Sequence, residues 1–275
     1  MKKIYLKLLS LAFFITFSNI NAQEFQGIAT YKYHRKMDFK DDDKEEGPKI
    51  NSELRKQLEE QLKKQAQQEY ILNFTQRESL YKKSERLQAP APSRSGISIS
   101  FSDGADLRYK NIKEQRFTNQ TESYGKLFLI QDSLNSPQWE LINETKNIGE
   151  YTCFKAQLKE EVESKQATET GFETVMKEKI TTAWYTPQIP VSNGPAEFHG
   201  LPGLILEINY GNVTLICSKI VINPEESFVI EEPKKGKKVS QSEYKAIMDK
   251  KFQEMQDQMG TRGKGGNTVI FSSGG

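Results

Sequence analysis

The chain has few of the residues that usually build metal sites and nucleophilic sites. It contains two histidines, His34 and His199, and two cysteines, Cys153 and Cys217, among its 275 residues. None of them has the spacing of a CxxC pair or of two histidines on one helical turn, so the sequence predicts no metal site and no cofactor. It also lacks the GxSxG, HExxH and phosphate-loop patterns, which are common signatures of hydrolases and nucleotide-binding enzymes.

An excess of one charge is missing as well. The chain has 39 lysines and arginines against 37 aspartates and glutamates, and the two kinds are interspersed. Without the first 22 residues, 36 basic residues face 37 acidic ones. Nothing in this distribution resembles the basic face of a nucleic-acid-binding protein, so we expect no nucleic-acid partner.

Long apolar runs are confined to the N-terminus. Residues 1–22 join a lysine-rich start to an apolar run from Leu8 to Phe17 and end at the small residue Ala22, before Gln23. The run is too short to span a bilayer of about 30 Å, so it predicts a secretory signal peptide that is cleaved after Ala22. The alternative is an uncleaved anchor. We expect an exported protein, periplasmic or secreted, with no transmembrane segment in the mature chain.

The two cysteines leave two alternatives open. In an exported chain an even number of cysteines suggests a disulfide. A bridge between Cys153 and Cys217 would close a loop of about 65 residues and stabilise the fold by about 4 kcal/mol in the loop-entropy account. The other alternative is two buried thiols in separate strands, because sequence alone does not bring the two Cα atoms within bridging distance.

Short segments with alternating apolar and polar residues follow one another along most of the chain. A Gly211-Asn212 pair between two of them is a hairpin signal. Repeated short strands with close turns predict a mostly antiparallel sheet. The clearest predicted strands are Phe25–Lys36, Glu69–Ser84, Lys126–Asp132, Glu150–Ala156, Lys179–Thr186, Leu204–Tyr210 and Val213–Asn223.

Two helices are predicted beside these strands. The first lies within residues 50–68, where leucines recur every fourth residue. The second begins after Ser240, which has Glu243 at the spacing of a capping box. Its apolar face can dock on the core or fill a groove of a partner. That face is formed by Tyr244, Ile247, Met248, Phe252, Met255 and Met259.

These elements divide the chain into three parts. Residues 1–22 are the signal peptide. Residues 23–232 form one β domain with a helical insertion at about 50–68. Residues 233–275 hold a basic loop at Pro233–Lys238, the amphipathic helix and a glycine-rich tail that we predict to be disordered.

Two sequence blocks resemble a known family. One is Tyr151–Ala156 (YTCFKA), and the other is the run 184–208, which contains Gly200-Leu201-Pro202-Gly203-Leu204-Ile205. Their order and spacing resemble the GLPGLI family of exported bacterial proteins, whose name describes this hexapeptide and implies no reaction. The resemblance implies a mainly β fold, a curved antiparallel sheet or half-open barrel with helices across its concave side. Such a fold is similar to periplasmic lipoprotein carriers and to accessory domains of some secreted glycosidases.

The GLPGLI segment itself has two interpretations. Three prolines between residues 187 and 195 prevent the preceding strand from continuing, and Gly200 and Gly203 permit close backbone approaches. The segment is therefore a rigid corner that locks a loop against the sheet. Alternatively it forms one lip of a ligand cavity, whose predicted lining is Trp184, Tyr185, Phe198 and His199.

Three functions follow as hypotheses. The first is a non-enzymatic binding or carrier protein for an apolar ligand, such as a lipid, or for an envelope component. The second is an accessory module that binds an envelope protein or a glycan. The third is a hydrolase that uses His199 as a base. Asp132-Ser133-Leu134 also resembles an acceptor for O-glycosylation at Ser133 in exported bacterial proteins. The oligomeric state is not predicted.

Overall fold

The computed structural model describes residues 25–35, 68–84, 106–168 and 171–262. The predicted signal peptide lies outside these residues. The predicted helix within 50–68 does so as well, except for Gln68, and so does the predicted glycine-rich tail, except for the last residues of the C-terminal helix. Within the described residues, no helix is both long and apolar enough to cross a membrane.

Twelve strands form one sheet in the order β12-β6-β5-β4-β3-β2-β1-β11-β10-β9-β8-β7. Neighbouring strands are antiparallel except for β12 and β6, which are parallel. A single described helix, α3, follows the last strand. The elements are β1 Gln26–Arg35, β2 Glu69–Thr75, β3 Glu78–Lys83, β4 Leu107–Asn111, β5 Arg116–Ser123, β6 Lys126–Ser133, β7 Glu140–Ile148, β8 Tyr151–Thr168, β9 Gly171–Thr186, β10 Leu204–Tyr210, β11 Val213–Ile222, β12 Lys237–Val239 and α3 Gln241–Arg262.

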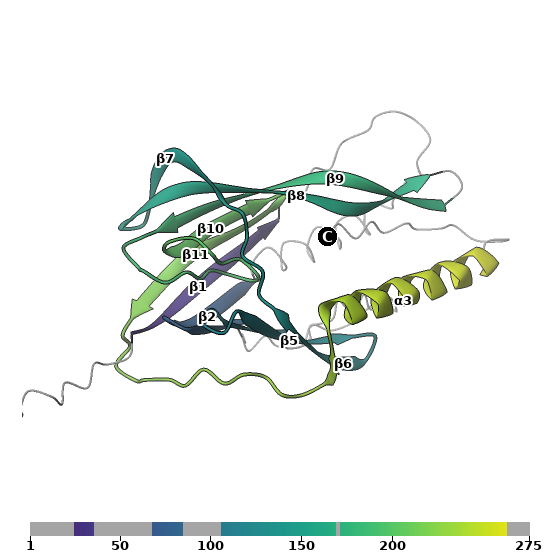
Figure 1. The fold of residues 1–275 in the computed structure, drawn as a ribbon, viewed down its shortest axis with the longest axis horizontal. Coiled ribbons are helices and arrows are strands. Elements are labelled where there is room, and N and C mark those ends of the chain that lie inside the picture. The colour runs from purple at the N-terminus through teal and green to yellow at the C-terminus, as the bar shows by residue number, and fades with distance from the viewer. Residues whose placement is uncertain (1–24, 36–67, 85–105, 169–170, 263–275) are drawn as a thin grey trace, which may run out of the picture.

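The sheet curls but does not close. Figure 1 shows β7, β8 and β9 above and β2, β5 and β6 below, with α3 beneath the long β8–β9 hairpin. Strands β12 and β7 are the two edges, so no pairing between described strands joins the ends of the sheet. The predicted mainly β fold, a curved antiparallel sheet with a C-terminal helix, is confirmed.

Three of the predicted strands differ by many residues from the strands of the structure. The segment Glu69–Ser84 is a hairpin of β2 and β3, because the Thr75 hydroxyl accepts hydrogen bonds from the backbone N–H groups of Arg77 and Glu78 and turns the chain. Strands β8 and β9 have 18 and 16 residues, far more than predicted, and pair along their whole length. Their distal halves are charged, so they lack the apolar alternation that marks a half-buried strand.

The two faces of the sheet are covered differently. Cross-strand pairing places Tyr31, Leu72 and Tyr81 on one face, which we call the inner face. The connection 187–203 packs against this face, because its residue Ile189 belongs to the same buried cluster as Tyr31, Leu72 and Tyr81. The core therefore lies between the curled sheet and the loop that carries the GLPGLI sequence.

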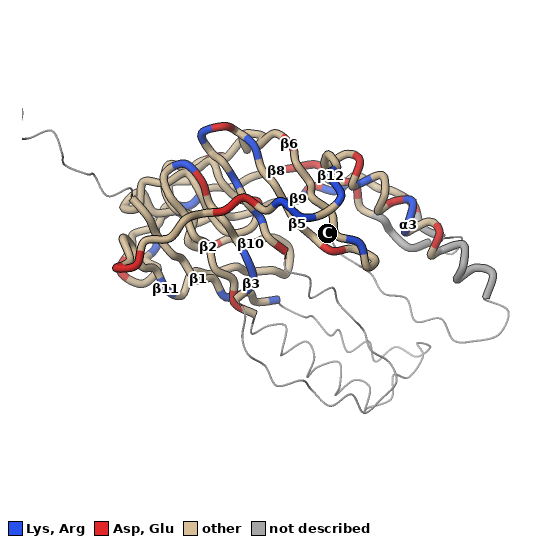
Figure 2. The backbone as a smooth tube through the Cα atoms, turned by 90° about the horizontal axis from the view of Figure 1, so that it is seen from below, with Lys and Arg blue, Asp and Glu red and all other residues tan. Residues whose placement is uncertain are grey.

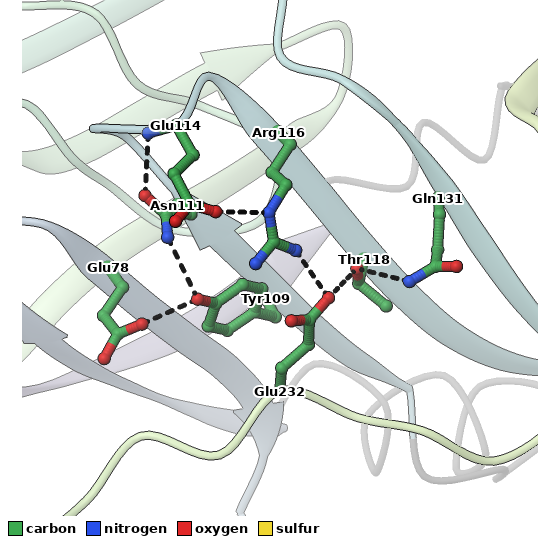
Figure 3. Close-up of polar contacts among 8 residues, drawn as sticks. All are labelled: Glu78, Tyr109, Asn111, Glu114, Arg116, Thr118, Gln131 and Glu232. Carbon is green, nitrogen blue, oxygen red and sulfur yellow. Dashed lines mark hydrogen bonds and ion pairs between the residues drawn. The ribbon is translucent and has the colours of Figure 1, made fainter.

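The outer face carries the segment that runs from β11 to β12 (Figure 1). Figure 3 shows how this segment is attached: the Glu232 carboxylate accepts from Arg116 at 2.6 Å and from the Thr118 hydroxyl at 2.5 Å. In the same network the buried Tyr109 hydroxyl donates to Glu78 at 2.6 Å, and burial followed by this bond raises the pKa of Tyr109 to about 12. These polar groups satisfy one another, so the network fixes the segment in place.

Helix α3 starts as the sequence predicts. The Ser240 hydroxyl accepts from the backbone N–H of Glu243 at 3.2 Å, and the Glu243 carboxylate accepts from the backbone N–H of Ser240 at 2.7 Å. Docking on the core is confirmed for the first two turns, where Tyr244, Ile247 and Met248 pack against a cluster of Phe128, Ile130 and Val239. Further along, Met255 is 42% exposed, so the predicted apolar face is not buried along its whole length.

Candidate functional site

The GLPGLI residues form a corner on the inner face. Gly200 has a φ of +92°, a conformation that favours glycine. At Gly203 a Cβ atom would lie 2.2 Å from the backbone oxygen of Thr186, so no side chain fits there. Leu201, Leu204 and Ile205 are each at most 1% exposed. This geometry is what the rigid-corner interpretation predicts.

A buried lysine holds the tip of this loop. Lys110 on β4 is 2% exposed, and its Nζ donates to the carbonyl oxygens of Gly194 at 2.9 Å and Phe198 at 2.8 Å. Burial lowers the pKa of Lys110 to about 7. A neutral amine has two N–H groups, and these two carbonyls can accept both of them. Strand β4 therefore ties the loop down whether or not the amine is charged.

His199 is enclosed by backbone groups. Its Nδ1 lies 2.9 Å from the carbonyl oxygen of Glu197, and its Nε2 lies 3.0 Å from the carbonyl oxygen of Asn135. The His199 carbonyl accepts from the indole N–H of Trp139 at 2.8 Å. Burial lowers the pKa of His199, while the two carbonyls act in the opposite direction. Only Nε2 reaches the connection between β6 and β7, because Nδ1 faces a carbonyl of the loop itself. A neutral imidazole has one N–H and donates to one of these two carbonyls at a time.

The four residues predicted to line one cavity do not share a surface. Tyr185, Phe198 and His199 are buried, at 5–7% exposure. Trp184 points to the opposite face of β9 from Tyr185, because successive side chains of a strand alternate. There its ring lies 4.4 Å from Lys146 Nζ and 5.9 Å from Lys155 Nζ. The structure therefore corrects the predicted lining: Trp184 lies apart from the other three.

Four other aromatic residues gather on the inner face. We call Tyr33, Tyr70, Tyr81 and Tyr210 the tyrosine cluster. Tyr70 stacks on Tyr81 with ring centroids 5.1 Å apart, and Tyr33 lies 6.5 Å from Tyr70. Tyr81 is buried, whereas the other three are partly exposed. Burial raises the pKa of Tyr210 to about 12, with smaller effects of Glu197, Tyr33, Arg108 and Tyr70, which places these groups near one another.

The loop tip and two cations border the tyrosine cluster. The Phe198 ring lies 5.8 Å from the Tyr210 ring, so the GLPGLI loop forms the inner wall of the cluster. Arg108 Nη1 lies 3.3 Å from a carboxylate oxygen of Glu197, and both side chains are well exposed, at 39% and 55%. Lys179 Nζ lies 4.9 Å from the centroid of the Tyr210 ring. Charged, hydroxyl and aromatic groups therefore meet at one place on the inner face.

The tyrosine cluster lies at one end of the sheet. Tyr33 is near the end of β1, Tyr70 near the start of β2 and Tyr210 at the end of β10. The backbone N–H of Tyr33 donates to the carbonyl of Gln68, and that of Ser84 donates to the carbonyl of Glu69. The chain therefore leaves the sheet after Arg35 and returns at Gln68 at this end. Long connections at one end of a sheet are a common setting for binding residues.

Sequence reasoning missed this cluster for a topological reason. Its tyrosines come from β1, β2, β3 and β10, and no spacing along the chain indicates that these strands lie in the same part of the sheet, with only β11 between β1 and β10. One signal was present: Tyr31 and Tyr33 alternate with Lys32, which places both rings on one face of their strand. Choosing that face as a site still required the strand order.

Two further predictions lie away from the cluster. Ser133 is exposed at the end of β6, and its hydroxyl lies 3.4 Å from Oδ1 of Asp132; its glycosylation stays a prediction. Cys153 and Cys217 are free, buried thiols, the second of the two alternatives, and the bridge is not formed in this structure. Burial raises the pKa of Cys153 to about 11 and that of Cys217 to about 12.

Comparisons with known proteins give one family match and two similar structures. A family profile described as "Protein of unknown function (Porph_ging)" matches residues 139–207. No curated protein matches the chain. Crystal structures of PNGF-II in the C2 and P21 space groups share 14% and 13% identity with it, with TM-scores of 0.48 and 0.49. Each similarity covers 81% of this chain and 32% of the other, so the chain spans about a third of the length of these structures.

Proposed function

We propose that this chain is an exported member of the GLPGLI family and a non-enzymatic binding or carrier protein that holds an apolar or amphipathic envelope component against the tyrosine cluster. The observation that carries the proposal is the convergence of four tyrosines from four strands beside an exposed ion pair, Arg108–Glu197. Aromatic rings with polar ends suit a ligand that has both apolar and polar surface.

The partial exposure of the rings supports a binding role. Tyr81 is buried and supports Tyr70 from below through the stacked contact at 5.1 Å. Tyr33, Tyr70 and Tyr210 are only half-buried. A tyrosine ring contributes a large apolar area and loses little side-chain entropy on binding, because it has only two flexible torsions. A supported ring is a preorganised contact surface.

The loop gives this surface a rigid wall. Phe198 contacts Tyr210, and the Phe198 carbonyl is held by Lys110. The glycine at position 203 lets the same loop approach the backbone of Thr186 closely. Because the wall is built before any ligand arrives, binding does not have to order it, and preorganisation of this kind improves affinity. On this account the GLPGLI residues act as a support.

The titratable groups of the loop favour binding over catalysis. Both ring nitrogens of His199 face backbone carbonyls, and the amine of Lys110 donates to two more. A general base has to reach the proton that it removes, within hydrogen-bond distance or through one water. Arg108, Glu197 and Lys179 lie at the rim of the cluster, where polar groups set the orientation of a ligand.

The test is native mass spectrometry of residues 23–275, secreted by a bacterial host and purified without detergent. We expect a bound small molecule that is lost from Tyr70→Ala and Tyr210→Ala. Trp184→Ala is the matched control, because it removes a partly buried ring from the opposite face of β9. Near-ultraviolet circular dichroism shows whether each variant keeps its packing. A ligand that survives both tyrosine substitutions, or disappears only in Trp184→Ala, places the site elsewhere.

A further inference from the structure

The outer segment that leads into β12 carries a dense run of lysines. Lys234, Lys235, Lys237 and Lys238 occupy four of five consecutive positions, and all four are exposed. Exposed Lys126 starts β6, the strand that pairs with β12. We call these five residues the lysine patch. Figure 2 shows basic residues following acidic ones along the segment that crosses in front of the sheet.

The lysine patch is held in a fixed position. At Gly236 the φ is +122°, and a Cβ atom would lie 2.7 Å from a backbone carbon of Phe128, so the chain is pressed against β6. The backbone N–H of Lys235 donates to the Gln120 side chain at 3.3 Å. Strand β12 then pairs with β6 from Lys237 onward. The lysines therefore project from an ordered segment at the edge of the sheet, where Lys237 lies on one face of β12 and Lys238 on the other.

Their charges are not neutralised within the described part of the chain. None of the five lysines of the patch makes an ion pair with a described residue. Along this segment, Glu232 is the nearest acidic residue whose carboxylate accepts hydrogen bonds. Arg116 and Thr118 are the donors of those bonds. The lysine patch thus keeps a local positive charge in a chain whose total charge is close to balanced.

Protection of a sheet edge explains only part of this pattern. Lysines on an edge strand discourage pairing with another chain. Lys237 and Lys238 lie on the edge strand β12, but Lys234 and Lys235 precede it and Lys126 belongs to β6. A three-residue edge is already short enough to resist pairing. The additional lysines call for a different explanation.

An exposed aromatic residue lies beside the lysine patch. Tyr124 is in the turn between β5 and β6, next but one to Lys126, and is 59% exposed. Pairing of Leu107 with Gln120 and of Lys82 with Leu107 places this turn at the end of the sheet where β3 ends, which is also the end of the tyrosine cluster. Tyrosine favours the interface between lipid headgroups and water.

We propose that the lysine patch, with Tyr124 at its tip, docks the protein on an anionic phospholipid surface. Lysine ammonium groups bind lipid phosphates as point charges, and a cluster of several is enough to concentrate a protein at such a surface. Docking through this patch brings the end of the sheet with the tyrosine cluster close to the lipid. This is a second contact, separate from the ligand site of the proposed function.

Vesicle sedimentation tests the docking directly. Residues 23–275 are mixed with vesicles of phosphatidylcholine alone or with about 30% phosphatidylglycerol, at low and high salt. We expect binding to the anionic vesicles only, and weaker binding at high salt because salt screens exposed charges. The variant with Lys234, Lys235, Lys237 and Lys238 changed to glutamine should bind at least tenfold more weakly, and Tyr124→Ala should weaken binding several-fold.

A second quadruple variant controls for total charge. Changing Lys32, Lys113, Lys177 and Lys219 to glutamine removes the same charge from exposed lysines scattered over the sheet, and binding should stay within twofold of the wild type. Equal losses in both quadruple variants, no binding to anionic vesicles, or binding to an acidic polysaccharide in their place would overturn the proposal. The lysine-patch variant should keep any ligand held by the tyrosine cluster, so the two proposals can fail independently.

Discussion

The amine of Lys110 lies 2.8 Å from the backbone oxygen of Phe198, so a buried cation on β4 fastens the loop that borders the tyrosine cluster. The same amine donates to the carbonyl of Gly194 at 2.9 Å. A lysine is an unusual residue to hold a loop in place from within a core, because burial of a charged group is costly unless the charge is lost or well paired. The pKa of about 7 indicates that the amine is close to losing its charge at neutral pH.

Replacing this lysine should make the stability of the fold less dependent on pH. The pKa of Lys110 is lowered to about 7 by burial, while an unfolded chain keeps the ordinary value of 10.5. Between these values the unfolded state binds more protons than the folded state, so this group makes the free energy of unfolding rise with pH. Each pKa unit corresponds to about 1.4 kcal/mol. Lys110→Met should remove that rise.

Urea denaturation at several pH values between 7 and 8.5 measures this effect. The range stays below pH 9, where buried tyrosines and cysteines begin to act in the opposite direction. Lys113→Met, in the exposed turn after β4, is the control and should follow the wild type. At neutral pH, Lys110→Met should also lower the free energy of unfolding by about 1–3 kcal/mol, because two buried carbonyls lose their hydrogen-bond donor. A pH profile parallel to the wild type would contradict the assigned burial of the charge.

The two glycines of the GLPGLI sequence should differ in their tolerance of a methyl group. Gly203→Ala places a Cβ 2.2 Å from the backbone of Thr186, which cannot move without breaking the pairing of β9 and β10. We expect a loss of more than about 2 kcal/mol, in the range of strongly destabilising substitutions. Gly200→Ala should cost about 1 kcal/mol, since it keeps a positive φ and meets Pro137 at 3.1 Å.

Pro202→Ala is the internal control for these glycines. Pro202 is exposed within the same hexapeptide, so its loss should change the free energy of unfolding by less than about 1 kcal/mol. Thermal and urea unfolding give the three values. If Gly203→Ala were as stable as Pro202→Ala, the close approach to Thr186 would be incorrect, and the hexapeptide would need another explanation than a rigid corner.

The thiols of Cys153 and Cys217 should be present but slow to react. Both are buried, and burial raises the pKa of each well above the ordinary value. Because the thiolate is the reactive form, a thiol reagent at neutral pH should label neither in the native protein within minutes. Under denaturing, non-reducing conditions it should label two. A mass two daltons lower, with no free thiol after denaturation, would show that the purified protein is bridged.

Local features of the fold were the ones that sequence could predict. The bounds of β10 and the capping box at Ser240 and Glu243 follow from patterns within a few residues. The turn at Gln76–Arg77 was not predicted, because it depends on one threonine hydroxyl rather than on glycine or proline. The full length of the β8–β9 hairpin was not predicted, because the distal halves of its two strands contain few apolar residues and lack the alternating pattern of a half-buried strand.

The candidate site depended on non-local information. Trp184 and Tyr185 are adjacent in sequence, and that adjacency is what sends them to opposite faces of β9. Tyr33 and Tyr210 lie near each other although they are separated by most of the chain, because β11 pairs with both β1 and β10. Nothing in the sequence around Lys110 distinguishes it from an exposed lysine, because its two carbonyl partners lie 84 and 88 residues away along the chain. Composition and spacing do not contain this strand order.

Photocrosslinking from the tyrosine cluster is the most direct test of the central claim. A photoreactive phenylalanine analogue replaces Tyr70 on the inner face, or Lys32, whose side chain points to the opposite face of β1, in protein secreted by living cells. Mass spectrometry then identifies the adducts. We predict an adduct of defined mass at position 70 and none at position 32. No adduct at position 70, or equal labelling at both positions, would contradict a ligand site at the tyrosine cluster.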